Sequence, residues 1–183
     1  ENDIVLVKEL TDETEADLKT IAETIVDMVN TEALSNVHVS FGRVGDEIRK
    51  VSNSFKEAKL AMSVGKIFNS DQDVYSYTSL GIGRLIYQLP IPMCRMFIEE
   101  IFKDQSPEDF DEETLTTISQ FFENNLNVSE TSRQLYIHRN TLVYRLDKLQ
   151  KNTGLDLRIF DDAIMFKIAL MVVRYMHYME NQE

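Results

Sequence analysis

The sequence predicts an α+β N-terminal half followed by an all-α domain that contains a helix-turn-helix. Two observations favour this fold class. Residues 1–89 contain three short strand-like runs separated by two long amphipathic patterns, whereas residues 107–183 show helical spacing throughout. Between the halves, Pro90 and Pro92 prevent a helix from continuing. We therefore expect an α+β domain at 1–89, a linker with a connecting helix at 90–106, and the helix-turn-helix domain at 107–183.

The N-terminal half alternates strands and helices. Residues 4–7, 37–41 and 74–77 have the character of strands, so we expect three strands with helices on one face of the sheet. The first helix follows Thr11, and its apolar face contains Leu18, Ile21, Ala22, Ile25, Met28 and Val29. The second helix is expected at 46–68, with a core stripe of Ile48, Val51, Phe55, Ala58 and Met62.

Three helices are expected around the helix-turn-helix. The connecting helix spans 93–103, and Ser106 and Pro107 then supply an N-cap and a first-turn proline for the next helix. The apolar residues of that next helix are Leu115, Ile118, Phe121 and Phe122. The last helix, capped by Asp161 and Asp162, is apolar nearly all round and needs a second partner. That partner is a second copy of the chain or the α+β half, and we favour the homodimer.

The helix-turn-helix itself is predicted from local signals between residues 127 and 154. Asn127 and Glu130 have the spacing of a capping box at the start of the first helix. Gly154 lies where a left-handed residue ends the second helix. The buried faces of the two helices are predicted to contain Val128, Ser132 and Leu135 in the first and Leu142, Leu146 and Leu149 in the second.

The opposite face of the second helix is polar and suits nucleic acid. It contains Asn140, Thr141, Tyr144, Lys148 and Lys151, flanked by Arg139 and Arg145. These cations, amide, hydroxyl and phenol match the donors and acceptors of base edges and phosphates. From residue 128 to residue 151 there are five basic and two acidic side chains, a local charge of +3 in a chain of net charge −12. The simpler alternative is a helical hairpin whose polar face is only solvated.

Composition excludes several classes of protein. A chain of 183 residues is long enough for a real core. Its single cysteine, Cys94, cannot form an internal disulfide and has no companion in metal-ligand spacing, so we expect a buried thiol in a reducing cytoplasm. We see no secretory signal and no convincing membrane span, and His38 is expected to be an ordinary exposed histidine. The acidic runs at 12–17 and 108–113 are interpreted as solvated helix starts.

The motif also resembles a known family. Residues 137–142 (Ile-His-Arg-Asn-Thr-Leu), 144–146 (Tyr-Arg-Leu) and 153–156 (Thr-Gly-Leu-Asp) are similar to the C-terminal helix-turn-helix of the CdaR/PucR transcriptional regulators. The resemblance implies a bacterial regulator of catabolism whose small-molecule effector is sensed upstream of this chain. Two positions depart from the pattern. Ser132 replaces the usual alanine, and Tyr136 fills a turn position often given to glycine, where a left-handed backbone would cost on the order of 1 kcal/mol.

The N-terminal half resembles the C-terminal part of a degenerate GGDEF domain. The similarity lies in residues 39–42 (Val-Ser-Phe-Gly), residues 55–58 (Phe-Lys-Glu-Ala) with Ala61, and the strand-like residues 3–6. Asn2 and Asp3 stand where an active cyclase of that family carries consecutive metal-binding acids. We therefore expect no enzyme activity, no catalytic residue, no metal and no cofactor.

We expect residues 129–150 to bind a specific sequence of double-stranded DNA. We expect the protein to be a dimer that does not bind membranes and that controls a catabolic operon. His138 is predicted to cap the second helix. The remaining contacts are assigned to Arg139, Asn140 and Thr141 at base edges, Tyr144, Arg145 and Lys148 at bases or phosphates, and Ser129, Thr131 and Arg133 at phosphates. The alternative is a catalytically inactive nucleotide-sensing or protein-interaction module of a signalling protein. Salt-sensitive DNA binding distinguishes the regulator from a pure interaction module.

Overall fold

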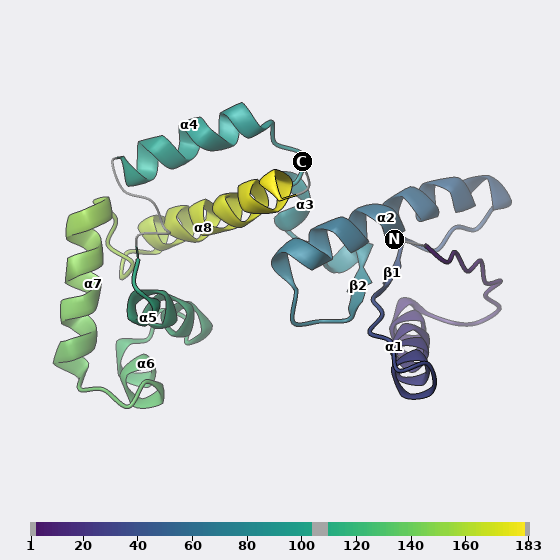
Figure 1. Cartoon of the computed structure of the whole chain (residues 1–183), viewed down its shortest axis with the longest axis horizontal. Coiled ribbons are helices and arrows are strands. Elements are labelled where there is room, and N and C mark those ends of the chain that lie inside the picture. The colour runs from purple at the N-terminus through teal and green to yellow at the C-terminus, as the bar shows by residue number, and fades with distance from the viewer. Residues whose placement is uncertain (1–2, 104–109, 182–183) are drawn as a thin grey trace. The chain divides into compact units, whose positions relative to one another are not determined.

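The computed structural model describes residues 3–103 and 110–181, which belong to two compact units, residues 1–88 and 89–183. The first unit contains helices and a small sheet, and the described part of the second is helical (Figure 1). This division is compatible with the predicted α+β half followed by an all-α domain. Within the described residues, no helix combines the length and the apolar character of a membrane span.

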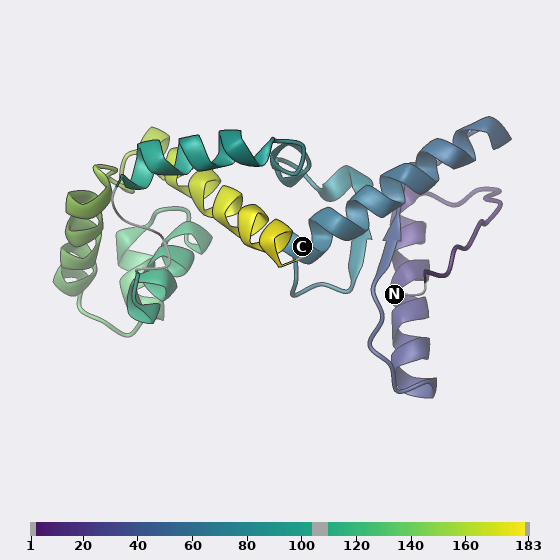
Figure 2. The same cartoon turned by 45° about the horizontal axis from the view of Figure 1, so that its top comes forward.

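The first unit is built around a strand-helix-strand arrangement. β1 (Val39–Phe41) and β2 (Val74–Ser76) are parallel, with Val39 paired to Val74, and α2 (Val51–Phe68) connects them. α1 (Glu15–Glu32) contacts both strands, as α2 does (Figure 2). The shorter elements are η1 (Ile48–Lys50), η2 (Tyr77–Ser79) and α3 (Gly83–Ile86).

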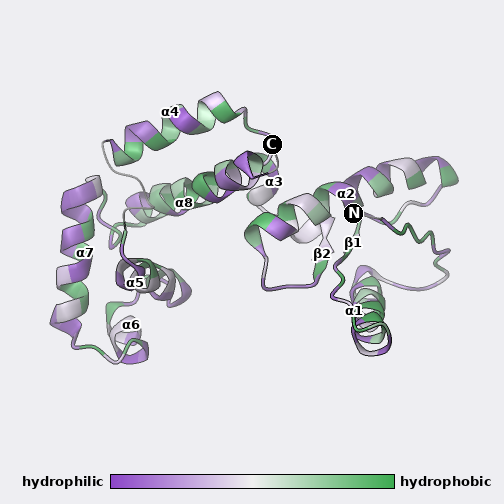
Figure 3. Ribbon diagram, viewed as in Figure 1, coloured by the Kyte–Doolittle hydropathy of each residue, from purple (hydrophilic) through white to green (hydrophobic). Residues whose placement is uncertain are grey.

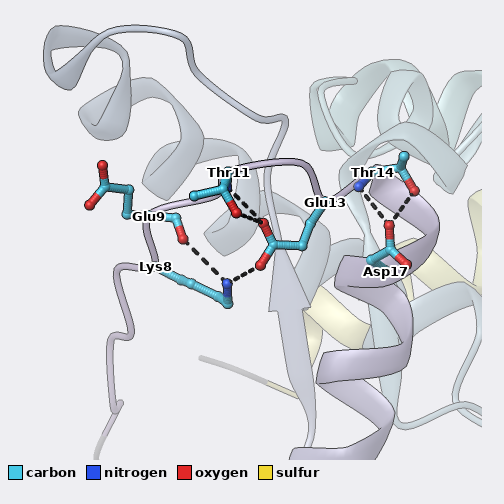
Figure 4. Close-up of polar contacts among 6 residues, drawn as sticks. All are labelled: Lys8, Glu9, Thr11, Glu13, Thr14 and Asp17. Carbon is cyan, nitrogen blue, oxygen red and sulfur yellow. Dashed lines mark hydrogen bonds and ion pairs between the residues drawn. The ribbon is translucent and has the colours of Figure 1, made fainter.

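Local hydrogen bonds fix the start of α1. Asp17 accepts hydrogen bonds at 2.7 Å from both the backbone N–H and the hydroxyl of Thr14, which satisfies an amide that the helix leaves free. Just before the helix, Lys8 and the N–H of Thr11 converge on Glu13 (Figure 4). The Lys8 hydrogen bond and then that of Thr11 lower the pKa of Glu13 to about 2.

The core of the first unit lies where the second half of α2 meets the strands. Its buried residues include Ala22, Val26, Ala61, Val64, Ile67 and Tyr75. A Cβ on Gly65 would lie 2.2 Å from Cγ of Tyr75, so only glycine allows this close approach of helix and ring. His38 stacks on Tyr75 at 5.7 Å, and its Nδ1 lies 3.3 Å from a carboxylate oxygen of Asp73.

Two predictions for this unit are wrong. Residues 4–7 form no strand and are exposed, because an apolar run needs a neighbouring strand edge and these residues pair with neither strand of the sheet. The sheet therefore has two strands in the described chain, where three were expected. α2 begins at Val51, and the first three residues of its predicted core stripe, Ile48, Val51 and Phe55, are exposed because the strands cover only the later turns.

The second unit packs its helices around one cluster of aromatic and aliphatic side chains. The helices are α4 (Ile91–Phe102), α5 (Glu112–Glu123), α6 (Val128–Gln134), α7 (Arg139–Thr153) and α8 (Phe160–Glu180). Phe102 of α4 and Phe166 of α8 meet edge to face, with ring centroids 5.6 Å apart. Figure 3 shows apolar residues along α8 and mostly polar residues along α7. Cys94 is buried as predicted, and burial raises the pKa of its thiol.

Several helix ends in this unit differ from the predictions. α4 begins two residues early, because the first turn of a helix tolerates a proline such as Pro92. The predicted start at Ser106 and Pro107 lies outside the described residues, and α5 instead has Asp111 as N-cap, accepting from the N–H of Thr114 at 2.7 Å. Ile159 is the N-cap residue of α8. The predicted caps, Asp161 and Asp162, lie in its first turn, where acids meet the positive end of the helix dipole.

Candidate nucleic-acid interface

The first helix of the motif, α6, starts as its sequence predicts. The side-chain oxygen of Asn127 accepts from the N–H groups of Ser129 and Glu130 at 3.0 and 3.1 Å. The reciprocal half of the expected capping box is replaced, because Glu130 forms an ion pair with Arg133 at 2.5 Å. One residue therefore caps the helix, and the other holds a neighbouring cation.

α6 contacts both α5 and α7. Ser132 is buried as predicted, and Val128 and Leu135 pack against the core. Thr131 is also buried, with no exposed surface, since α6 contacts both α5 and α7. The predicted phosphate contact by Thr131 is therefore wrong.

The turn between the two helices contains a residue in the left-handed region. Tyr136 has φ of 53°, the conformation that was expected to be strained at this position. Its N–H donates to the carbonyl of Arg133 at 3.1 Å, and the next N–H, from Ile137, donates to that of Ser132 at 3.0 Å. These bonds end α6 within two residues and turn the chain directly into α7.

α7 is held at both ends and along one side. Nδ1 of His138 accepts from the N–H of Asn140 at 3.2 Å, which places this histidine at the N-cap as predicted. At the other end, Gly154 adopts φ of 79°. The predicted stripe of Leu142, Leu146 and Leu149 is buried in the core. The orientation of α7 is therefore fixed from behind.

The first turn of α7 presents polar groups outward. Arg139, Asn140 and Thr141 are exposed, and Tyr144 one turn later is 68% exposed. Among the residues that the structure describes, Arg139 has no ion-pair partner. A free guanidinium, an amide and a hydroxyl on one rigid turn can contact base edges without first breaking an internal bond.

The cations in the middle of α7 are held by α5. Arg145 is only 18% exposed, donates to the Thr117 hydroxyl at 3.0 Å and pairs with Glu113. Arg145 therefore binds α7 to α5. Its predicted contact with DNA stays a prediction and would require these bonds to break. Lys148 remains exposed, with its Nζ 3.9 Å from a carboxylate oxygen of Asp111.

The acids at the start of α5 reduce the positive charge of the motif. Hydrogen bonds from Thr114, followed by the charges of Lys148 and Arg145, lower the pKa of Asp111. Of the five cations counted from the sequence, three face acids, and in the described chain only Arg139 and Lys151 have no such partner. Sequence reasoning missed this because it treated the acidic run as solvated. The only local signal was that Glu113 and Thr117 lie four residues apart on one helix face.

Two polar residues of α6 remain exposed and can contact a ligand. Ser129 is exposed, and the side chain of Arg133 is largely exposed although it pairs with Glu130. Ser129 lies in the first turn of α6, Arg133 in its last turn, and Arg139 in the first turn of α7. The hydroxyl of Ser129 and the guanidinium groups of Arg133 and Arg139 can donate hydrogen bonds to the phosphates that line a DNA groove.

Comparison with known proteins assigns the motif. Residues 114–172 match the family described as the PucR C-terminal helix-turn-helix domain. The Purine catabolism regulatory protein of Bacillus subtilis (strain 168) is 27% identical over 139 residues, 74% of this chain and 26% of the relative. The Carbohydrate diacid regulator of Escherichia coli (strain K12) is 31% identical over 134 residues, 73% of this chain and 35% of the relative. The chain thus spans about a quarter to a third of the length of these relatives.

A solved structure is also similar. The crystal structure of the Regulator of Polyketide Synthase Expression from Bifidobacterium adolescentis is 21% identical, with 67% of this chain and 50% of that chain covered. Its TM-score of 0.40 is too low to support a conclusion. The sequence matches confirm the predicted resemblance for the helix-turn-helix.

Proposed function

We propose that this chain is part of a bacterial transcriptional regulator that binds a specific sequence of double-stranded DNA through residues 129–150. The observation that supports this most is the first turn of α7. There, Arg139, Asn140 and Thr141 are exposed, while the His138 cap and the buried leucine stripe fix the helix that presents them. A recognition helix places its N-terminal residues at base edges in the major groove in the same way.

The proposed roles follow from exposure and partners. Arg139, Asn140 and Thr141 contact base edges, and His138 sets the start of the helix. Tyr144 and Lys148 contact bases or phosphates further along, while Ser129 and Arg133 contact phosphates from α6. Arg145 holds α7 in place from its bonds to α5 and is not assigned to DNA.

We further propose that the regulator acts as a homodimer. One recognition helix contacts only a few base pairs, so specificity requires two half-sites about 34 Å apart or a multiple of that distance. Ile164 and Met165 on α8 are exposed apolar residues available to a second copy. A DNA-binding domain at 107–183 then acts with an effector-sensing region outside this chain. The name of the Purine catabolism regulatory protein favours a catabolic operon as the target. We place the regulator in the cytoplasm, where bacterial DNA lies.

For residues 1–89 we keep the proposal of a degenerate GGDEF-like domain without catalytic activity. The parallel strand-helix-strand arrangement at Val39–Ser76 is compatible with it. Asn2 and Asp3 remain the reason to expect no cyclase chemistry, because a metal site needs more than one acid there. We assign to this half the role of connecting the effector-sensing region to the DNA-binding domain, so that effector binding changes DNA binding.

The experiment is selection of genomic DNA fragments by the purified chain, followed by affinity measurements at two salt concentrations on the enriched and a scrambled site. We expect an enriched inverted or direct repeat, with binding that weakens as salt rises because phosphate contacts release counterions. Weak binding that is indifferent to both sequence and salt would refute DNA recognition and favour a protein-interaction module.

A further inference from the structure

Tyr136, in the turn of the motif, combines two unfavourable features. Its backbone is left-handed, with φ of 53°, which strains any residue with a Cβ. Its side chain is 96% exposed, so the ring gains nothing from packing in this chain. Glycine would relieve the strain at no loss of contacts.

Other left-handed residues of the chain have a structural explanation or lie away from the motif. Leu126 packs against the core of the second unit, and asparagine, as at Asn125, tolerates this conformation. Lys103, which ends α4, is also left-handed and exposed, with φ of 53°. Leu34 is a large apolar residue with φ of 51° and 90% exposure, and it lies in the loop after α1. Leu34 therefore provides a matched control.

The residues around Tyr136 indicate which kind of group its side chain contacts. The residue lies two positions before the His138 cap, between Arg133 at the end of α6 and Arg139 at the start of α7. When a recognition helix lies in the major groove, the helix before it crosses the sugar-phosphate backbone, and Tyr136 lies in the turn that joins these two helices. Arg139 has no acidic partner among the described residues, although Arg133 pairs with Glu130. The guanidinium of Arg139 favours an anion near this turn, and a phenol hydroxyl can donate a hydrogen bond to that anion.

We infer that the hydroxyl of Tyr136 donates a hydrogen bond to a DNA phosphate at the edge of the groove that α7 enters. This inference rests on the proposed function. The contact does not depend on the base sequence, and it sets the depth at which Arg139 and Asn140 meet the base edges. On this inference the strained backbone at Tyr136 serves DNA binding and does not stabilise the fold.

The test compares Tyr136→Phe, Tyr136→Gly and Leu34→Gly in the full chain, on the enriched and the scrambled DNA. Tyr136→Phe removes only the hydroxyl, so we expect affinity to fall about tenfold on both DNAs. The salt dependence should not change, because a neutral group releases no counterion. Tyr136→Gly should bind as weakly or more weakly, while its melting temperature is unchanged or higher than that of the wild type. Leu34→Gly should show the same thermal behaviour with wild-type affinity.

The outcomes separate this inference from the proposed function. Wild-type affinity in Tyr136→Phe would overturn the phosphate contact while leaving DNA recognition intact. A lower melting temperature in Tyr136→Gly would also overturn it, because the ring would then serve the fold. If the wild-type chain itself shows no salt-dependent binding, both the proposed function and the inference fail.

Discussion

The first turn of α7 and its middle turns carry the same kinds of side chain in different surroundings. Arg139 faces outward with no ion-pair partner among the described residues, whereas Arg145, six positions later, is tied to Glu113 and Thr117 of α5. Lys148 lies between these cases, exposed but near Asp111. A cation on the polar face of a helix can thus serve a ligand or the fold, and only the neighbouring helix decides which.

The largest effect on DNA affinity is expected at Arg139, the one of these three cations without an acidic partner in the described part of the chain. Arg139→Ala should cost about 1 to 3 kcal/mol in binding to the enriched DNA and much less on scrambled DNA, because a lost bidentate base contact matters only where the base is present. The free energy of unfolding should not change. Titration of both DNAs, with urea unfolding as the control, measures this. Equal losses on the two DNAs would show that Arg139 does not contact bases.

Arg145→Ala should affect stability instead. Its charged hydrogen bond to Thr117 is mostly shielded from water, so its loss should lower the free energy of unfolding by about 1.5 kcal/mol. A double-mutant cycle with Thr117→Val isolates that bond. DNA binding by the folded fraction should remain close to wild type. A selective loss of affinity with unchanged stability would return Arg145 to the DNA interface.

A smaller effect is expected between Asp111 and Lys148. Asp111→Asn keeps an N-cap residue for α5 and removes the charge near Lys148, so affinity for any DNA should rise roughly two- to fourfold. Lys148→Ala should weaken all DNA comparably and lower the salt slope by about one. In the Lys148→Ala background, Asp111→Asn should raise the affinity for DNA by a smaller factor. An undiminished gain would mean that Asp111 acts on DNA without Lys148.

The smallest effect concerns acid stability. Because the folded protein lowers the pKa of Asp111, the folded state keeps this carboxylate ionised where the unfolded chain takes up a proton. The stabilisation is present above about pH 4, the value of an unperturbed aspartate, and is lost as the pH falls further. Urea midpoints at pH 6 and pH 3 should therefore differ less for Asp111→Asn than for the wild type. The same difference in both proteins would exclude Asp111 as a contributor.

Local features of the motif were predictable from sequence. These features are the Asn127 and His138 caps, the left-handed Gly154 and the leucine stripe of α7. Each depends on residues within one or two turns of each other. The burial of Thr131 and the bonding of Arg145 were not predictable, because both depend on α5, whose position the helical pattern of α6 and α7 does not specify.

The same distinction holds in the first unit. The α1 helix and the strands at β1 and β2 follow from apolar spacing within each segment. The strand expected at residues 4–7 required a partner edge, and the stripe expected early in α2 required a covering layer, neither of which periodicity can supply. Patterns in a sequence specify what a segment prefers, and the neighbours determine what it buries.

The pairing of β1 with β2 also has a kinetic consequence. Val39 and Val74 are thirty-five positions apart, so their hydrogen bonds form only after the intervening chain has closed on itself. α6 and α7, by contrast, are joined by a turn of a few residues and meet without a long search. Folding rates fall as contacts become more distant in sequence. On this basis the helix-turn-helix acquires its shape early, and the sheet of the first unit forms more slowly.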